Sequence, residues 1–293
     1  MILPRLPIAE YIADQVGLDV PTLSASAAHT LLSKSPRHCW HGHPRLNPAW
    51  EREDSEQAEI GTLAHSLLLE GDQSRLVIVE ADDWRTKAAR EKRDAARAGG
   101  KLPVLEHKAA DVIQMVATAC LAIQASELRP EWSTGKVEQT LIWQEGETWC
   151  RCRPDWMSKD GRILLDFKTT GGTAEPDAFS RGMLLAMGYD MQAAFGLRAV
   201  KALVKPRECS FVFMVQETDP PYAVSFIGLS PLWEDFADRK MAAALTSWRA
   251  CLDSGEWPGY PPRICWAEPP AFGVQRFEER AAFASNEQGV DQL

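Results

Sequence analysis

Two acids and a lysine stand close together near the middle of the chain, in a pattern that could do chemistry. Asp155, Asp166 and Lys168 follow the spacing Asp-x10-Asp-x-Lys around a Ser-Lys-Asp-Gly turn. The apolar, β-prone run 162–169 predicts a strand, and side chains two apart on a strand share a face, about 6.6 Å apart. Asp166 and Lys168 are therefore expected to point the same way, while Phe167 points to the opposite face.

Asp155 is expected to close the preceding strand, and the turn then brings it alongside Asp166. Two carboxylates beside one ammonium suit a hard divalent cation together with a group that handles an oxyanion or a water. A surface salt bridge at the end of a hairpin is the alternative, because Asp-x-Lys is a common pattern. Spacing alone leaves both interpretations open.

Two upstream segments contain polar residues that could complete such a site. Glu59–Glu70 predicts a helix that carries His65 one turn after Gly61. A lone histidine on such a helix is more often a packing residue than a ligand. Glu138 lies in the apolar run Val137–Trp143, which predicts a strand that pairs with the next apolar run.

A downstream helix is expected around Gly-Tyr-x2-Gln, with Tyr189 and Gln192. In order, the chain then has Gly-x3-His, a Glu on a strand, Asp-x10-Asp-x-Lys and Gly-Tyr-x2-Gln. This ordered set resembles the PD-(D/E)xK nuclease superfamily in its RecB-like branch, and most of all the nuclease domains of the exodeoxyribonuclease VIII (RecE) type found in many prophages. The resemblance extends from about Leu23 to Tyr260.

The resemblance implies an α/β fold with a PD-(D/E)xK restriction-endonuclease-like core, in which helices flank a central mixed sheet. It implies a site for one or two Mg²⁺ ions, for which Mn²⁺ is expected to substitute. Lys168 would orient the attacking water and offset charge on the phosphate. The metal ligands that the resemblance implies are His65, Glu138, Asp155, Asp166 and the carbonyl of Phe167.

Gln192 is implied as a nucleic-acid-binding residue, although the sequence departs from the family pattern beside it. The RecB-like pattern continues as Gln-x3-Tyr, whereas this chain has Gly196 at the fourth position. Tyr189, one turn before Gln192, is expected to take over the role of that aromatic residue.

The activity implied is hydrolysis of linear double-stranded DNA from 5′ ends, which leaves 3′ single strands for phage-type recombination. Relatives form closed rings around DNA, so a homo-oligomer is expected, and a single-strand annealing recombinase is a candidate partner. An endonuclease, or a DNA-end-binding repair or restriction protein on the same fold, is the main alternative. A third interpretation involves no nucleic acid and makes the segment from Asp155 to Lys168 a structural hairpin.

The charge of the chain argues against DNA binding by the surface as a whole. Lys and Arg number 32 and Asp and Glu number 41, which gives a net charge of −9. The run Arg85–Arg97 is nevertheless strongly basic, and Arg90, Lys92 and Arg93 are expected to contact phosphates. A solvated helix with internal salt bridges is the alternative for this run.

Composition indicates a soluble protein in a reducing compartment. Of 293 residues, 45% are hydrophobic and 25% charged, and no apolar run approaches the roughly 18 residues that span a bilayer. The N-terminus lacks the build of a signal peptide, and seven cysteines fit a reducing cytosol. We expect a cytoplasmic protein of a bacterial host, encoded by a phage or prophage, without membrane contact.

Cys251 and Cys265 are isolated, so no iron–sulfur cluster of the kind found in some RecB-like relatives is expected. One nuclease domain is expected over residues 1–267, with a helical part at 20–130 and a catalytic core at 131–267. Residues 268–293 are rich in Ala, Glu and Gln with few apolar anchors, which predicts a mobile tail.

Overall fold

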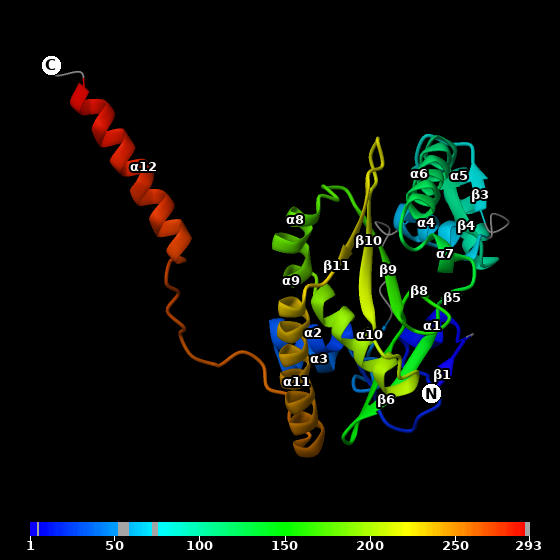
Figure 1. Ribbon diagram of the computed structural model, residues 1–293, viewed down its shortest axis with the longest axis horizontal. Coiled ribbons are helices and arrows are strands. Elements are labelled where there is room, and N and C mark those ends of the chain that lie inside the picture. Colours follow the sequence, from blue (N-terminus) through cyan, green and yellow to red (C-terminus); the bar gives the residue numbers. More distant parts are fainter. Residues whose placement is uncertain (5, 52–58, 72–75, 291–293) are drawn as a thin grey trace. The chain divides into compact units, whose positions relative to one another are not determined.

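The structure, a computed structural model, describes residues 1–4, 6–51, 59–71 and 76–290 (Figure 1). The chain divides into two compact units, Met1–Gly259 and Tyr260–Leu293. The first unit is a mixed α/β fold. Its described strands are β1 (Ile2–Leu3), β2 (Leu23–Ser24), β3 (Leu76–Val79), β4 (Leu102–Leu105), β5 (Lys136–Val137), β6 (Thr140–Glu145), β7 (Thr148–Cys152), β8 (Trp156–Met157), β9 (Ile163–Thr170), β10 (Ser210–Glu217) and β11 (Val224–Gly228).

Local capping sets where several helices begin. The side chains of Ser24, Ser35, Thr86 and Ser230 accept hydrogen bonds from the first-turn N–H groups of the helices that follow them. The helices of the first unit are α1 (Ile8–Ile12), α2 (Ala25–Ser33), α3 (Pro36–Gly42), α4 (Glu59–Glu70), α5 (Lys87–Ala98), α6 (Glu106–Ala125), α7 (Arg129–Trp132), α8 (Pro176–Ala178), the π-helical turn Phe179–Met183, α9 (Leu184–Ala186), α10 (Tyr189–Leu203) and α11 (Pro231–Ser254).

The central sheet has the strand order β11-β10-β9-β8-β5. Strand β9 runs parallel to β10 and antiparallel to β8, while β11 and β5 pair antiparallel with their neighbours, so the sheet is mixed. Helices lie on both sides of it (Figure 1). The expected fold class, a mixed sheet flanked by helices, is therefore confirmed.

The side chains of β9 alternate between two cores, as the period of a strand requires. Leu164 is buried in the core that includes residues of α10 and α11. Leu165 and Phe167 are buried on the opposite face, against residues of α4 and α6. The predicted strand 162–169 is confirmed as β9, and Asp166 and Lys168 lie on the α10 side.

A second sheet, in the order β1-β6-β7-β2, carries the hairpin that precedes the central strands. The predicted pairing of β6 with β7 is confirmed. The placement of Glu138 on a strand is wrong: Glu138 lies between β5 and β6 and has a φ of 54°. This left-handed backbone interrupts the extended run, so Glu138 lies at a kink between the two strands.

The predicted helix that carries His65 is confirmed as α4, and the basic run lies on α5. A glycine allows α4 to approach the end of β9 closely. A Cβ atom at Gly61 would lie 2.8 Å from the Thr169 Oγ1 atom. The absence of a side chain at this position therefore lets the start of α4 lie against the end of β9.

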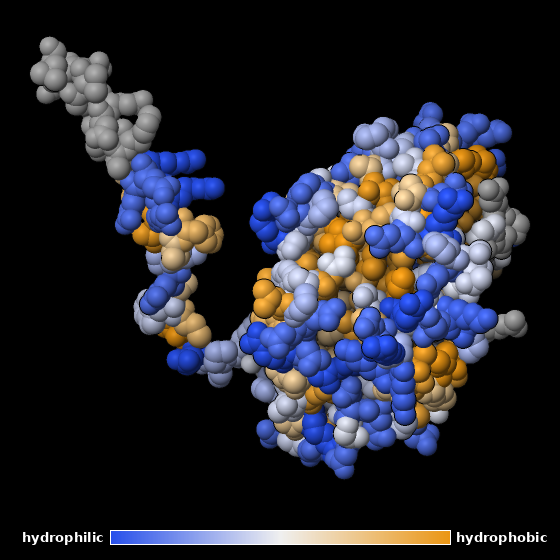
Figure 2. Space-filling view, viewed as in Figure 1, coloured by the Kyte–Doolittle hydropathy of each residue, from blue (hydrophilic) through white to orange (hydrophobic). Residues whose placement is uncertain are grey.

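The second unit contains the helix α12 (Ala271–Val290) after a proline-rich segment. Apolar side chains are exposed along this unit, and Figure 2 shows them interspersed with charged ones. The large exposed ones include Tyr260, Ile264, Trp266, Phe272 and Phe277. The mobility of residues 268–293 stays a prediction, and residues 291–293 lie outside the described residues.

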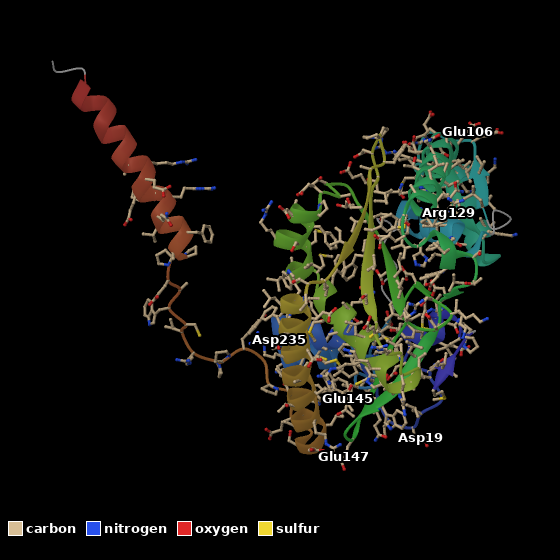
Figure 3. All side chains as sticks on the ribbon, in the orientation of Figure 1. Asp19, Glu106, Arg129, Glu145, Glu147 and Asp235 are labelled. Carbon is tan, nitrogen blue, oxygen red and sulfur yellow. The ribbon has the colours of Figure 1, made fainter. Side chains whose placement is uncertain are left out.

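Charged side chains surround the first unit. Figure 3 labels some of them, of which Glu145 is partly buried: Asp19, Glu106, Arg129, Glu145, Glu147 and Asp235. Most of this set is acidic, in keeping with the net charge of −9. No helix in the described part of the chain combines the length and apolarity needed to cross a membrane.

Candidate active site

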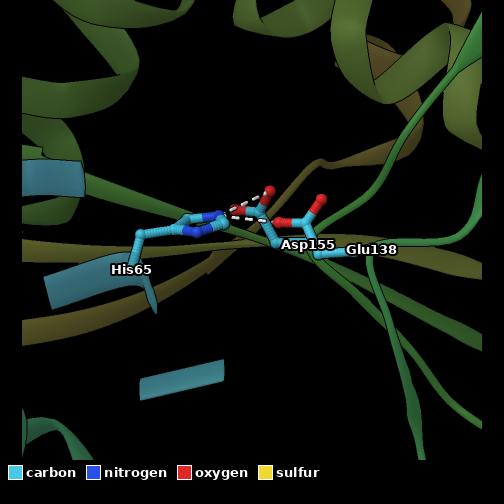
Figure 4. Close-up of side chains that lie close together, drawn as sticks. All are labelled: His65, Glu138 and Asp155. Carbon is cyan, nitrogen blue, oxygen red and sulfur yellow. Dashed lines mark ion pairs between the residues drawn. The ribbon is translucent and has the colours of Figure 1, made fainter. Parts of the chain in front are cut away.

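Three segments that are distant in sequence bring an imidazole and two carboxylates together (Figure 4). The Nε2 atom of His65 lies 3.0 Å from Asp155 Oδ1 and 3.5 Å from Glu138 Oε1. One ligand atom from each residue lies within 4.8 Å of the other two. His65 comes from α4, Glu138 from the kink before β6, and Asp155 from the residue before β8.

Asp155 is positioned by the register of the hairpin between β8 and β9. Trp156 pairs with Leu165, so continuing the antiparallel register places Asp155 opposite Asp166. The backbone N–H of Phe167 donates a hydrogen bond of 2.6 Å to Asp155 Oδ2. The expectation that Asp155 closes the preceding strand is wrong, because β7 ends at Cys152. Its expected proximity to Asp166 is nevertheless correct.

A second group of polar residues lies on the α10 side of β9. Lys168 Nζ contacts Asp166 Oδ1, and the Gln192 side-chain amide donates to Asp166 Oδ2. The Asp166 side chain is 2% exposed and that of Lys168 is 21% exposed. The ammonium of Lys168 also lies 4.6 Å from the centre of the Tyr189 ring. Asp166 is thus held by two donors inside the molecule.

Burial makes ionisation of Asp166 costly. Together with the negative charge of Asp155, burial raises the pKa of Asp166 from 3.8 to about 7, against the opposing effect of Lys168. Burial lowers the pKa of Lys168, but the carboxylates of Asp166 and Asp155 outweigh it, so the net shift is upward. Lys168 therefore remains charged at neutral pH, whereas Asp166 is poised to exchange a proton.

His65 is balanced in a similar way. Burial lowers its pKa, but the hydrogen bond to Asp155 and the charges of the nearby carboxylates outweigh burial and raise the pKa above its ordinary 6.5. When the imidazole is protonated, it is the partner that the chain itself supplies to Asp155 and Glu138. A divalent cation would compete with this proton for the same carboxylate atoms.

The donor set fits a divalent metal ion. His65, Glu138 and Asp155 offer one nitrogen and two carboxylate oxygens, and Asp166 would add a carboxylate after losing its proton. The structure brings Phe167 to the same place, through the N–H contact with Asp155, although its expected role as a carbonyl ligand stays a prediction. Carboxylate oxygens suit Mg²⁺ or Mn²⁺, and the imidazole nitrogen of His65 suits Mn²⁺ better than Mg²⁺.

The packing around Gly196 leaves no room for the tyrosine that the RecB-like pattern has at this position. A Cβ atom at Gly196 would lie 2.7 Å from the ring of Phe211 and 3.0 Å from the side chain of Leu164. A tyrosine at position 196 would require β9 and β10 to move. Tyr189, by contrast, places its ring beside Lys168. Its role, like that of Gln192, stays a prediction.

The basic residues expected to touch phosphates lie on α5. Arg90 and Lys92 are exposed, while Arg93 has a side chain that is 15% exposed and lies 5.8 Å from the centre of the Trp84 ring. Arg93 also donates to its neighbour Asp94 at 3.0 Å. Two of the three cations thus point to solvent, and their contact with DNA stays a prediction.

Sequence reasoning missed Arg153. Its Nε atom contacts Glu138 Oε2, and its NH1 atom donates to the carbonyl oxygen of Leu6 at 2.6 Å. The only local signal was an arginine two residues before Asp155. That signal gives no indication of a partner 147 residues away along the chain.

A mixed sheet that presents Asp155, Asp166 and Lys168, with a helix supplying His65, defines the PD-(D/E)xK class of nuclease cores. The family comparison agrees with this class. The chain belongs to the family described as a PDDEXK-like domain of unknown function (DUF3799), whose model matches residues 29–265. Among curated proteins no significant match was found.

One solved structure shows a similar fold at low sequence identity. A protein from Eubacterium rectale described as a "putative exonuclease" superposes with a TM-score of 0.55 and 12% identity, over 92% of this chain and 97% of its own. A structure of the protein SSO0001 has a TM-score of 0.32 and 11% identity, over 82% of this chain and 87% of its own. The first likeness supports the fold, and the second is too distant to support any conclusion.

Proposed function

We propose that the chain is a Mg²⁺-dependent exodeoxyribonuclease that hydrolyses linear double-stranded DNA. The observation that carries this proposal is that a set of metal-binding side chains lies close to a buried aspartate and lysine. His65, Glu138 and Asp155 gather metal-binding atoms, and Lys168 and Gln192 hold Asp166 beside them. The description of the Eubacterium rectale protein as an exonuclease supports the same activity.

In this proposal His65, Glu138, Asp155 and Asp166 would hold the ion. A bound Mg²⁺ would lower the pKa of a coordinated water and stabilise negative charge on the phosphate. Lys168 supplies a charged ammonium that donates to oxygen atoms of the phosphate as negative charge builds there. The Gln192 amide fixes the orientation of the Asp166 carboxylate, and the Tyr189 ring limits where the Lys168 ammonium can lie.

Asp166 has a proton to lose when the ion binds. With a pKa of about 7, Asp166 would lose that proton to neutral solution at little cost, and the resulting carboxylate would be paired with Lys168. His65 likewise gives up its proton when its nitrogen becomes a ligand. The site is therefore set to exchange protons for a divalent cation near neutral pH.

The finer assignment concerns direction and assembly. We propose digestion from 5′ ends that leaves 3′ single strands for phage-type recombination, in a ring-shaped homo-oligomer that hands them to an annealing recombinase. A ring would keep the enzyme on its substrate, since one chain of 32.6 kDa has little surface with which to enclose a duplex. Basic side chains of α5 would contact the phosphates of the entering DNA.

One assay tests the proposal. Linear duplex labelled at its 5′ or 3′ end and covalently closed plasmid are incubated with the protein in Mg²⁺ and in EDTA. We expect loss of the 5′ label first, survival of the closed plasmid, no reaction in EDTA, and a mass above one chain by light scattering. Efficient cutting of closed plasmid would make the protein an endonuclease, and binding of ends without hydrolysis would make it an end-binding protein.

A further inference from the structure

Glu138 is displayed in a conformation that its sequence does not favour. Its φ of 54° lies in the left-handed region, which costs a residue with a Cβ atom free energy that its surroundings must supply. Its backbone N–H donates to the carbonyl oxygen of Asp155 at 3.0 Å, so the two segments that carry the acids are joined. The backbone thus fixes where the Glu138 side chain starts, and something else must fix where it ends.

Arg153 contacts the end of that side chain. Its Nε atom donates to Glu138 Oε2, while its NH1 atom donates to Leu6 O at 2.6 Å and reaches Thr140 Oγ1 at 3.4 Å. The Arg153 side chain is only 11% exposed. The guanidinium is therefore anchored on two sides and is not a mobile surface charge.

The contact with Arg153 gives the two Glu138 oxygens different partners. With Oε2 taken by Arg153, Oε1 is the atom that faces His65, at 3.5 Å. We propose that Arg153 is a positioning residue for the metal ion, which holds Glu138 so that one carboxylate oxygen is turned toward His65 and Asp155. This inference rests on the proposed function, because it presumes that the three side chains hold a divalent cation.

Two effects of Arg153 on the ion oppose each other. Its positive charge repels a cation, whereas its hydrogen bonds orient a ligand. Partners that orient ligands typically change metal affinity or activity by about 10–100-fold when removed. The orienting effect should dominate here, because the guanidinium is anchored at Leu6 and Thr140 and so holds the Glu138 carboxylate in one place. Lysine cannot replace it fully, since one ammonium lacks the planar fork that reaches Glu138 and Leu6 together.

The test is a double-mutant cycle read by the Mg²⁺ concentration that gives half-maximal cleavage of linear duplex. The variants are Arg153→Gln, Glu138→Gln and the double variant, with Arg153→Lys as the conservative change. Arg162→Gln is the matched control, because Arg162 is 57% exposed and pairs with Asp160 and Glu131 away from the site. Melting in EDTA shows whether each variant is folded.

We expect Arg153→Gln to raise the required Mg²⁺ by about 10–100-fold while the KM for DNA and the salt dependence stay unchanged. Arg153→Lys should recover part of this loss, and the double variant should be no worse than Glu138→Gln alone, because the two residues act as one unit. Arg162→Gln should behave like the wild type.

Three outcomes would overturn the proposal: an unchanged Mg²⁺ requirement in Arg153→Gln, additive losses in the double variant, or full recovery by lysine. Additive losses with a weakened KM for DNA would make Arg153 a phosphate contact instead. If the wild type cleaves no DNA, the proposed function fails. Calorimetric binding of Mg²⁺ to the same variants still decides the positioning role, because it requires no turnover.

Discussion

The two halves of the site differ in origin and in pairing. His65, Glu138 and Asp155 come from three separate segments, and their side chains are 27%, 19% and 14% exposed. Asp166 and Lys168 come from one strand, and their side chains are 2% and 21% exposed. The first half gathers donor atoms from separate segments, whereas the second half contains one deeply buried carboxylate that is paired with a lysine on the same strand.

This difference indicates how each half responds to its surroundings. In the first half, Arg153 pairs with one oxygen of Glu138, while His65 faces the other oxygen and Asp155. In the second half, Lys168 forms an ion pair with Asp166, Gln192 donates a hydrogen bond to it, and burial raises its pKa. We expect the first half, together with Asp166, to govern metal affinity, and Lys168 to govern the rate of the chemical step.

The largest loss of activity is expected for Asp155→Asn. Asp155 contacts His65 in the first half and accepts from the N–H of Phe167, which lies between the two residues of the second half. The amide oxygen of the variant can still accept from the Phe167 N–H, so folding should survive. The charge that attracts the ion is lost, and Mg²⁺-dependent cleavage should fall to background. Calorimetry should show the loss of Mg²⁺ binding, while gel shifts should show that DNA still binds. Unchanged metal affinity would move the metal site elsewhere.

Lys168→Ala tests the second half of the site, formed by Asp166 and Lys168. Removal of one group that stabilises a transition state usually lowers the rate by about 10²–10³-fold, and we expect that loss in kcat. The Mg²⁺ concentration at half-maximal rate should change much less. Single-turnover kinetics at saturating Mg²⁺ and DNA measure the effect, with melting curves as the control for folding. Near wild-type turnover would remove Lys168 from the mechanism.

His65→Ala should have a smaller effect than either change, because the carboxylates of Glu138 and Asp155 remain. Mn²⁺ accepts nitrogen and mixed donors more readily than Mg²⁺, so it should partly restore the variant. Parallel titrations of activity with the two ions provide the measurement. A loss that equals that of Asp155→Asn, with no recovery in Mn²⁺, would contradict the expectation that His65 contributes less to metal binding than Asp155.

The positions of Asp166, Lys168 and His65 could be read from local patterns. The period of a strand placed Asp166 and Lys168 on one face, and their contact agrees with it. The helix that carries His65 was expected over Glu59–Glu70, and α4 has those bounds. Patterns of this kind are set by neighbours in sequence, which is why they are visible in a single chain.

The surroundings of Glu138 could not be read in this way. An apolar run predicted a strand, but the tertiary contact with Asp155 and Arg153 favours a left-handed residue there. The N-terminal segment that anchors Arg153 through Leu6 is 147 residues away in sequence. Local propensity has no information about such a partner. The left-handed backbone at Glu138 and the contacts of Arg153 could therefore be recognised only from the three-dimensional structure.

The pH dependence of metal binding sharpens the comparison further. The folded pKa of Asp166 is raised from 3.8 to about 7, so its protonation favours the metal-free fold, and this contribution is lost as pH rises through 7. A bound Mg²⁺ would take the place of this proton. The rise in Tm caused by Mg²⁺ should therefore grow as pH rises toward 7 and level off above it, with affinity rising by at most about tenfold per pH unit for each proton released.

Asp166→Asn and His65→Ala provide the controls for that titration. Each removes one titrating group, so each should flatten the pH dependence of the Mg²⁺-induced shift in Tm without reversing it. Calorimetry in buffers of different ionisation enthalpy counts the protons released. A shift in Tm that is independent of pH in the wild type would show that neither group exchanges a proton for the ion.

The smallest effect is expected outside both halves, on α5. Arg90 and Lys92 are exposed, so replacing them and Arg93 by alanine should weaken DNA association without changing kcat at saturating DNA. Each neutralised phosphate contributes a slope of about −0.9 to the logarithmic salt dependence of binding, so removing cations that bind phosphates should flatten the slope by about that amount for each one. Fluorescence anisotropy at several salt concentrations, in EDTA to prevent cleavage, measures the slope.

Arg239→Ala is the matched control for α5, since Arg239 is an exposed arginine on α11 that pairs with Asp235 on the same helix. It changes net charge without altering α5, so any flattening of the slope beyond that of the control belongs to α5 itself. An unchanged slope in the triple variant would make α5 a solvated helix with internal ion pairs. In that case the DNA path must run along other basic residues, and the site halves alone would have to hold the substrate.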